Sequence, residues 1–208
     1  IIDASWHLVK NRNAIEEYNK EHIENTIFFD LDKNSNQNRD LPHGHFLPSL
    51  SSHEKTVSKM GISNSDRIII YCYSDLISSC RAWFQFLYFG HDPKLVSVLD
   101  GGMKKWKLEG RKITNLKTKI IPSNYKADEN KNMVKIKPQI EKNIKRKEFV
   151  VLDARSKKRF LGLEPEPRPG IKSGSIEGSK SIPLSEIVNK KDNTFLDTKK
   201  LRDIFNSS

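Results

Sequence analysis

Both cysteines of the chain lie in one stretch, "DRIIIYCYSDLISSCRAW", from Asp66 to Trp83. Cys72 ends an apolar, β-branched run, and Cys80 falls in the first turn of a predicted helix. Backbone N–H groups of a tight loop and of a helix N-terminus stabilise a thiolate and lower the pKa of its thiol. Cys72 is therefore the candidate nucleophile, with a buried packing thiol as the alternative. The position of Cys80 is typical of packing.

Two other kinds of chemistry fit this stretch less well. A phosphatase of this layout needs an arginine six residues after the nucleophile, but that position is Ser78 and the nearest arginine is Arg81. A metal site that combines Cys72 with His43 and His45 lacks convincing further ligands. We therefore expect neither a metal nor a cofactor.

Composition narrows the remaining classes of function. With 208 residues, 36% apolar and 30% charged, the chain is long enough to bury one large or two small cores. The net charge of +11 comes from scattered lysines without a recognition motif, which favours small anionic ligands over nucleic acid. No membrane helix or signal peptide is recognisable, so we expect a cytoplasmic protein without a membrane partner. An apolar run that starts at Ile1 instead of Met indicates a fragment.

The elements that must position these residues follow a regular alternation. Short apolar, β-branched runs are candidate strands at 1–4, 26–32, 67–72 and 95–101. Helical patterns lie between them, which is typical of an α/β fold with a parallel sheet covered by helices. The polar stretch "IIPSNYKADENKNM" has linker composition. The predicted parts are a first domain at 1–118, a linker at 119–134 and a second domain at 135–208.

An internal repeat underlies this division. The opening "IIDASW" is echoed by "VLDARS", so that Asp3 corresponds to Asp153 with an offset of 150. Ile23 corresponds to Ile176 with an offset of 153. Two nearly constant offsets indicate two copies of one domain. Adding them to position 72 places the counterpart of Cys72 at 222 or 225, so we expect the second copy to be incomplete in this sequence.

Several longer segments carry a resemblance to a known family. They include "DASWHL", "HFLPS", "RAWFQFLYFGHDPKLVSVLDGGMKKWKLEG" and "VLDARSKKRFLGLEPEPRPGIKSGSIEG". Together they resemble the tandem-domain rhodaneses, the family of 3-mercaptopyruvate and thiosulfate sulfurtransferases. The resemblance implies two rhodanese-like domains, each a parallel sheet flanked by helices. It also implies that the catalytic cysteine belongs to the second domain and lies beyond Ser208.

The resemblance implies an activity as well. Sulfur would pass from a small anionic donor, 3-mercaptopyruvate or thiosulfate, through a cysteine persulfide to cyanide or a thiol acceptor such as thioredoxin. The family's donor-binding arginines match Arg159 and Arg168, and Arg168 favours 3-mercaptopyruvate. Without the motif, Arg159 is interpreted as a surface ion pair and Arg168 as a basic loop residue.

The first domain of the family contributes an aspartate and a histidine to the catalytic cysteine. They match Asp32 and a histidine of "PHGHFLP", where two extra residues leave the register open between His43 and His45. The following "FLP" favours His45. The alternative role of Asp32 is to cap the turn after its strand.

The loop after Cys72 departs from the family pattern. Tandem enzymes usually carry an aspartate at this position, and their first domain is inert. The loop is longer than the six-residue active loop of single-domain rhodaneses, and Ser74 replaces a glycine that would let backbone amides crowd the sulfur. We expect no working persulfide site there. The alternative for the whole chain is a non-catalytic rhodanese-like module that binds a sulfur carrier or a protein partner.

Overall fold

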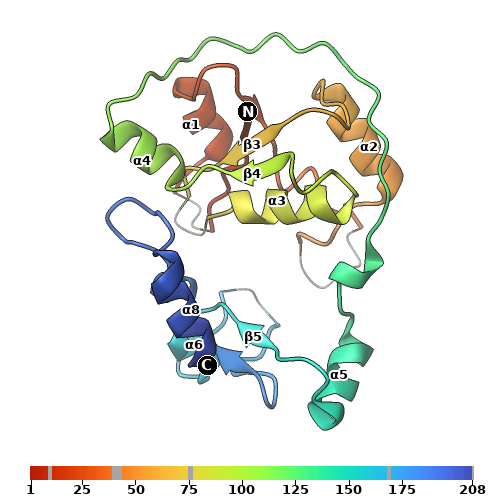
Figure 1. Ribbon diagram of the computed structural model, residues 1–208, viewed down its shortest axis with the longest axis vertical. Helices are drawn as coiled ribbons and strands as arrows, with labels where there is room; N and C mark the ends of the chain where they lie inside the picture. Colours follow the sequence, from red (N-terminus) through yellow and green to blue (C-terminus); the bar gives the residue numbers. More distant parts are fainter. Residues whose placement is uncertain (9–10, 39–43, 75–76, 168–169, 208) are drawn as a thin grey trace. The chain divides into compact units, whose positions relative to one another are not determined.

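The computed structural model describes residues 1–8, 11–38, 44–74, 77–167 and 170–207. The chain divides into two compact units, Ile1–Met133 and Val134–Ser208 (Figure 1). The first unit contains β1 (Ile2–Asp3), α1 (Ala14–Lys20), β2 (Ile27–Phe28), α2 (Leu50–Lys59), β3 (Ile68–Tyr71), α3 (Ser79–Tyr88), β4 (Val96–Val98), α4 (Gly102–Leu108) and a short 3₁₀ helix (Lys131–Met133). The second contains α5 (Lys137–Arg146), β5 (Leu152–Asp153), α6 (Lys157–Phe160), β6 (Lys180–Ser181), α7 (Leu184–Ile187) and α8 (Thr198–Asn206).

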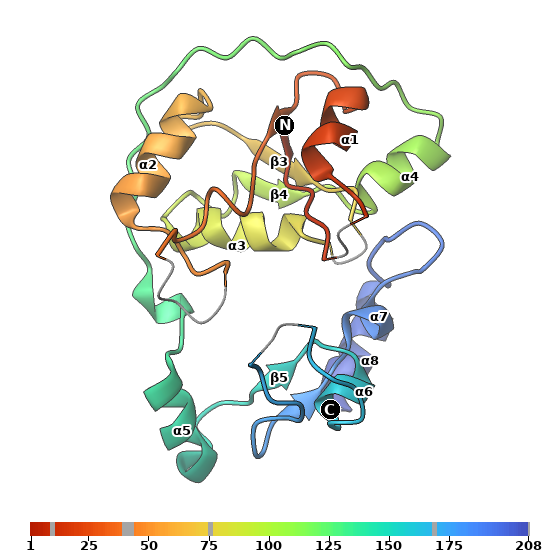
Figure 2. The ribbon, with the colours of Figure 1, turned by 180° about the vertical axis from the view of Figure 1, so that it is seen from behind.

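The first unit is built on a parallel sheet with the strand order β2-β1-β3-β4. Ile2 of β1 pairs with Ile27 on one side and with Ile70 on the other, so β1 lies inside the sheet although it is short. Side chains alternate across a strand, and β3 shows this directly. Ile68 and Ile70 join one apolar cluster with α2 and α3, while Tyr71 joins a second cluster with Met103 of α4. The sheet is thus covered on both faces, and the predicted α/β class is confirmed (Figures 1 and 2).

The stretch predicted as a linker belongs to the first unit. After α4 the chain runs in an extended path around this unit, as Figure 2 shows, and His22 and Thr114 form an antiparallel bridge. Ser123 donates its N–H to the carbonyl of Ser58, and Tyr125 is 1% exposed within the main core cluster. The compact unit accordingly extends to Met133. The polar composition of the segment gave no sign of this buried ring, which holds the segment together with the backbone hydrogen bonds.

The second unit reproduces the start of the first with the offsets found in the sequence. Asp3 pairs with Phe28 in the first sheet, and Asp153 pairs with Ser181 in the second, both in parallel. The carboxylates also close the same local turn: Asp3 accepts the N–H of Ser5 at 2.9 Å, and Asp153 accepts the N–H of Arg155 at 2.9 Å. Two copies of one strand-turn arrangement are therefore present.

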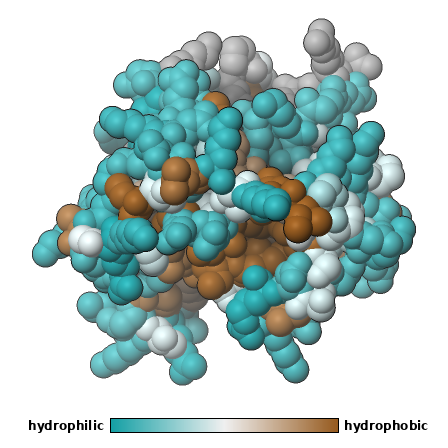
Figure 3. All heavy atoms as spheres, turned by 90° about the horizontal axis from the view of Figure 1, so that it is seen from above, coloured by the Kyte–Doolittle hydropathy of each residue, from teal (hydrophilic) through white to brown (hydrophobic). Residues whose placement is uncertain are grey.

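The face of the molecule seen from above is mostly hydrophilic, with apolar side chains gathered near its middle (Figure 3). Within the described residues, no helix is both long and apolar enough to span a membrane.

Candidate functional site

Asp32 and His45, far apart in the loop that follows β2, are brought together. The Nε2 atom of His45 lies 2.6 Å from Oδ1 of Asp32. The indole Nε1 of Trp6, just after β1, donates to both oxygens of the same carboxylate at 3.1 and 3.2 Å. Asp30 holds the turn by accepting the N–H of Asp32 at 3.1 Å. A carboxylate on one imidazole nitrogen fixes the orientation of the ring, as in general acid–base sites.

His45 is also held from its backbone. Its φ of 69° lies in the left-handed region, where a non-glycine residue needs compensating contacts. Arg81 of α3 donates from Nη2 to the His45 carbonyl at 2.9 Å, and Trp6 packs edge-on against the imidazole at a centroid distance of 4.7 Å. Burial lowers the pKa of Arg81. The alternative histidine, His43, lies outside the described residues.

Trp6 and Arg81 were missed as parts of this arrangement by the sequence reasoning. Trp6 stands in "DASWHL", a segment quoted for its family resemblance, and Arg81 was weighed only as a possible phosphate ligand. No local pattern indicates that these two residues hold the pair in place, because their contacts to Asp32 and His45 span 26 and 36 positions of the chain. The strand order, which places the ends of β1 and β3 side by side, brings them near the loop.

Cys72 lies at the end of β3 with its thiol turned into the unit. The residue is 6% exposed, and its Sγ lies 3.4 Å from the hydroxyl of Ser79. Three described amides of this loop have other acceptors: Tyr73 donates to Ser5 Oγ at 2.7 Å, and Ile77 and Ser78 both donate to oxygens of Ser74 at 3.4 Å. These described amides cannot also stabilise a thiolate at Cys72.

Cys80 is less suited still to nucleophilic chemistry. It follows Ser79 in the first turn of α3 and is partly buried. Burial, followed by the nearby thiol of Cys72, raises the pKa of Cys80 to about 11. A thiol with such a pKa carries almost no thiolate at neutral pH.

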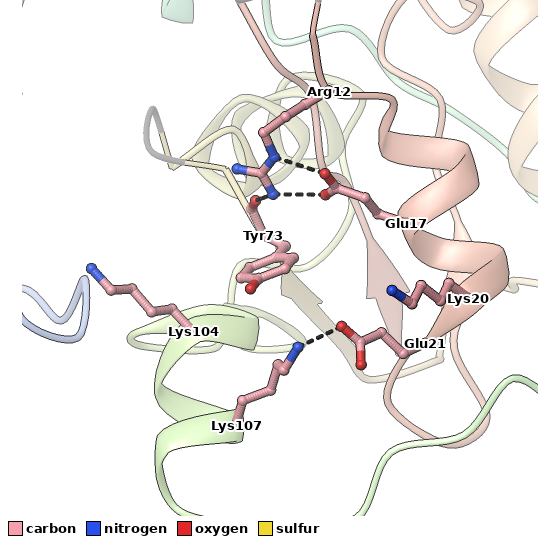
Figure 4. Close-up of a pocket in the computed structure, with 7 residues that line it drawn as sticks. All are labelled: Arg12, Glu17, Lys20, Glu21, Tyr73, Lys104 and Lys107. Carbon is pink, nitrogen blue, oxygen red and sulfur yellow. Dashed lines mark hydrogen bonds and ion pairs between the residues drawn. The ribbon is translucent and has the colours of Figure 1, made fainter.

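A charged pocket of about 570 Å³ lies beside Tyr73, between α1 and α4 (Figure 4). Arg12 forms a two-pronged ion pair with Glu17, with both N–O distances at 2.7 Å, and also donates to the carbonyl of Tyr73. Lys107 donates to Glu21 at 2.5 Å across the pocket. Both acids of the pocket are thus neutralised by cations of the same pocket, while Lys20 and Lys104 add positive charge to the lining.

Arg159 of the second unit lies in α6. Ser156 caps this short helix, since its hydroxyl accepts the N–H of Arg159 at 3.3 Å. The guanidinium is bound by Glu166 through Nε at 3.2 Å and through a shorter contact from Nη2. Arg168, the second expected donor-binding residue, lies outside the described residues. Of the two expected arginines, Arg159 is therefore described, and its guanidinium is held rigidly by Glu166.

Arg155 and Glu166 complete this cluster, and sequence reasoning singled out neither. Arg155 donates to Glu166 at 2.6 Å and to Asp153 from Nε at 3.0 Å. The hydrogen bonds from Arg159, with the positive charges of Arg159 and Arg155, lower the pKa of Glu166. The repeat contained a signal: Arg155 stands where the first copy has Ser5 in the same turn.

In the described part of the chain, no group of three or more His, Cys, Asp and Glu side chains is arranged to hold a metal ion.

Known proteins resemble the chain over both units. The rhodanese-like domain family matches residues 1–109. The 3-mercaptopyruvate sulfurtransferase of Rattus norvegicus is 37% identical over 191 residues, which are 90% of this chain and 63% of the relative. The thiosulfate sulfurtransferase of Rattus norvegicus is 34% identical, with the same two coverages.

A solved structure agrees with these sequence relatives. SseA from Escherichia coli, whose structure is described with the catalytic mechanism of 3-mercaptopyruvate sulfotransferases, matches with a TM-score of 0.87 and 25% identity. The match covers 99% of this chain and 76% of SseA. The chain spans less than two thirds of the length of the curated relatives named above.

Proposed function

The chain belongs to the rhodanese-like family, and on that premise we propose that it is part of a sulfurtransferase that takes sulfur from a small anionic donor. The donor is 3-mercaptopyruvate or thiosulfate, and the acceptor is cyanide or a thiol such as that of thioredoxin. The observation that carries this proposal is the identity of 34–37% to sulfurtransferases of both kinds across nine tenths of the chain. We place the protein in the cytoplasm, although one relative from Arabidopsis thaliana is named as mitochondrial.

The reaction runs through a persulfide. A cysteine thiolate attacks the sulfur of 3-mercaptopyruvate, an S–S bond forms, the donor's C–S bond breaks, and the thiol proton moves to the carbon that becomes the methyl group of pyruvate. An acceptor thiolate then attacks the outer sulfur and releases the cysteine thiolate. In this proposal the nucleophile is the second-copy counterpart of Cys72 at position 222 or 225, because the described amides near Cys72 have other acceptors.

The described residues supply two of the functions that the reaction needs. The guanidinium of Arg159 is fixed and suits the carboxylate of the donor, supported in the proposal by Arg168. In the proposal the Asp32–His45 pair serves proton transfer and charge stabilisation, since the carboxylate orients the imidazole. Asp32 has a side chain that is 68% exposed, so its carboxylate is open to a partner group.

The test uses the full-length protein and measures pyruvate release from 3-mercaptopyruvate in the presence of reduced thioredoxin. We expect Cys72→Ser to retain the wild-type rate within about twofold, and Arg159→Lys to raise KM about tenfold because the fixed, planar guanidinium is lost. Mass spectrometry after donor exposure should find one added sulfur atom on a cysteine other than Cys72. Loss of turnover in Cys72→Ser would place the chemistry in the first unit and contradict the proposal.

A second candidate is a non-catalytic module that docks a sulfur carrier on its basic surface. The net charge of +11 is the observation in its favour. Full-length protein that binds thioredoxin or another carrier but neither gains sulfur nor releases pyruvate would support this candidate over the enzyme.

A further inference from the structure

One carboxylate joins both described arginines of the second-unit cluster. Glu166 Oε1 accepts from Arg155 Nη1 at 2.6 Å and from Arg159 Nε at 3.2 Å, while Oε2 accepts from Arg159 Nη2. The Glu166 side chain is only 4% exposed. Pro165 and Pro167 flank it and restrict the backbone on both sides. A buried carboxylate with this many charge-assisted hydrogen bonds has very little freedom of orientation.

All three guanidinium nitrogens of Arg155 donate hydrogen bonds within the cluster. Its Nε lies 3.0 Å from each oxygen of Asp153, its Nη2 lies 2.5 Å from Asp153 and 2.6 Å from the Gly174 carbonyl, and its Nη1 binds Glu166. Each of its three nitrogens therefore already has an acceptor. An arginine in this state braces its neighbours and offers little to a ligand.

The guanidinium of Arg159 is hydrogen-bonded along one edge only, among the described residues. Nε and Nη2 bind Glu166, but among the described residues Nη1 has no hydrogen-bond acceptor. The side chain is 25% exposed, so solvent reaches the guanidinium. The result is a guanidinium fixed along one edge, with no acceptor at its remaining nitrogen among the residues that the structure describes.

We propose that Glu166, braced by Arg155, is the positioning residue that fixes Arg159 with its Nη1 side presented to the anionic group of the sulfur donor. This inference rests on the proposed function and names a residue that acts through Arg159. Asp153, Glu166, Arg155 and Arg159 together sum to zero formal charge, so the cluster does not attract anions by excess charge. Affinity then depends on orientation, because a fixed guanidinium loses less side-chain entropy on binding.

The substitution Glu166→Asp distinguishes the effect of the carboxylate's position from the effect of its charge. It keeps the negative charge but is one methylene shorter, so it cannot reach both arginines with the same geometry. In the full-length protein, Glu166→Asp should raise KM for 3-mercaptopyruvate about tenfold and leave kcat within about twofold. Glu164→Gln is the control for loss of an acid from the same segment, because Glu164 contacts Ser156 and no described arginine; it should leave KM within about twofold.

A double-mutant cycle tests whether Glu166 acts through Arg159. In an Arg159→Lys background, Glu166→Asp should change KM by less than about twofold, since the orientation it controls is already lost. A full additional tenfold rise would overturn the inference and indicate a purely structural effect. Thermal melts accompany each variant, and if Glu166→Asp fails to fold, the length-preserving Glu166→Gln replaces it with the same expected direction.

Failure of this inference can be told apart from failure of the proposed function. Wild-type protein without pyruvate release would contradict the sulfurtransferase activity itself. An active wild type whose Glu166→Asp variant matches Glu164→Gln in KM would contradict the positioning role alone.

Discussion

His53 of α2 is an imidazole enclosed by aromatic rings. It is 1% exposed and stacks on Phe89 at a centroid distance of 4.1 Å, with Phe86 and Tyr125 edge-on to it. Its Nδ1 lies 3.3 Å from the amide of Gln85, and its buried Nε2 has no partner among the described residues. Burial, followed by repulsion from His91, lowers the pKa of His53 to about 3. The ring is therefore held neutral in the fold.

As a result, the free energy of unfolding of the first unit should fall as the pH is lowered. The unfolded chain binds a proton at His53 near pH 6.5, while the folded chain does not do so until about pH 3, so acid favours unfolding. We expect a loss of about 2 kcal/mol in the free energy of unfolding between pH 6.5 and 5, measured by guanidinium denaturation. His53→Phe should remove this loss. A variant with the same pH slope as wild type would show that another group titrates.

Asp3 changes the stability with pH in the opposite direction to His53. Wild type must therefore be compared with His53→Phe at each pH. Burial raises the pKa of its carboxyl above the ordinary value, which favours the protonated form in the fold. Its contribution to stability is present at acid pH and is lost as pH rises through the raised pKa. The difference between wild type and His53→Phe cancels this term, because both proteins keep Asp3.

At the scale of elements, helix α4 lies against the end of β3 through a glycine. Gly102, its first residue, has a φ of 51°, and a Cβ there would overlap the carbonyl oxygen of Cys72. The N–H of Met103 donates to that same carbonyl at 3.0 Å. The helix can begin at this point only because residue 102 has no side chain.

Gly102→Ala should therefore destabilise the first unit more than an ordinary glycine replacement. Gly110 is a matched control, since its φ of 64° is also positive but nothing lies within 4 Å of its Cβ position. We expect a cost of about 1 kcal/mol for Gly110→Ala, from the left-handed backbone alone, and about 3 kcal/mol or more for Gly102→Ala. Equal costs in urea denaturation would contradict the role of close packing at Cys72.

At the scale of the whole molecule, the two units have very different cores. The first buries residues from β1, β3 and β4 and from three helices, whereas Ile182 and Pro183 are the buried apolar side chains among the described residues of 134–208. Val150, just before β5, and Leu152, its first residue, are 64% and 45% exposed. Apolar burial is the main favourable contribution to folding, so the second unit has the smaller stability.

Denaturation of residues 1–208 should show two transitions. We expect the second unit to unfold at lower guanidinium concentration, with its amides exchanging faster than those of β3. Ile182→Ala should remove the lower transition and leave the upper one unchanged, whereas Ile70→Ala should shift the upper one by a loss of about 2–5 kcal/mol. A single transition affected by both substitutions would contradict this independence.

The α/β class was determined by the sequence itself, and its motifs pointed to the residues of the candidate site. Apolar runs at strand spacing and offsets of 150 and 153 predict two strand-turn copies, and the structure pairs Asp3 and Asp153 at those offsets. The family motifs singled out Asp32, His45 and Arg159, and the first two lie within hydrogen-bonding distance. Local pattern suffices here because each signal lies within one short segment.

Only the tertiary structure decided which groups hold these residues in place. Trp6 and Arg81 reach the Asp32–His45 pair from other strands and helices, and Tyr125 turns a polar stretch into part of the first unit. Glu166 became significant when its carboxylate was found between Arg155 and Arg159. Hydrogen bonds of this kind depend on distances across the fold, and the periodicity of a chain carries no information about them.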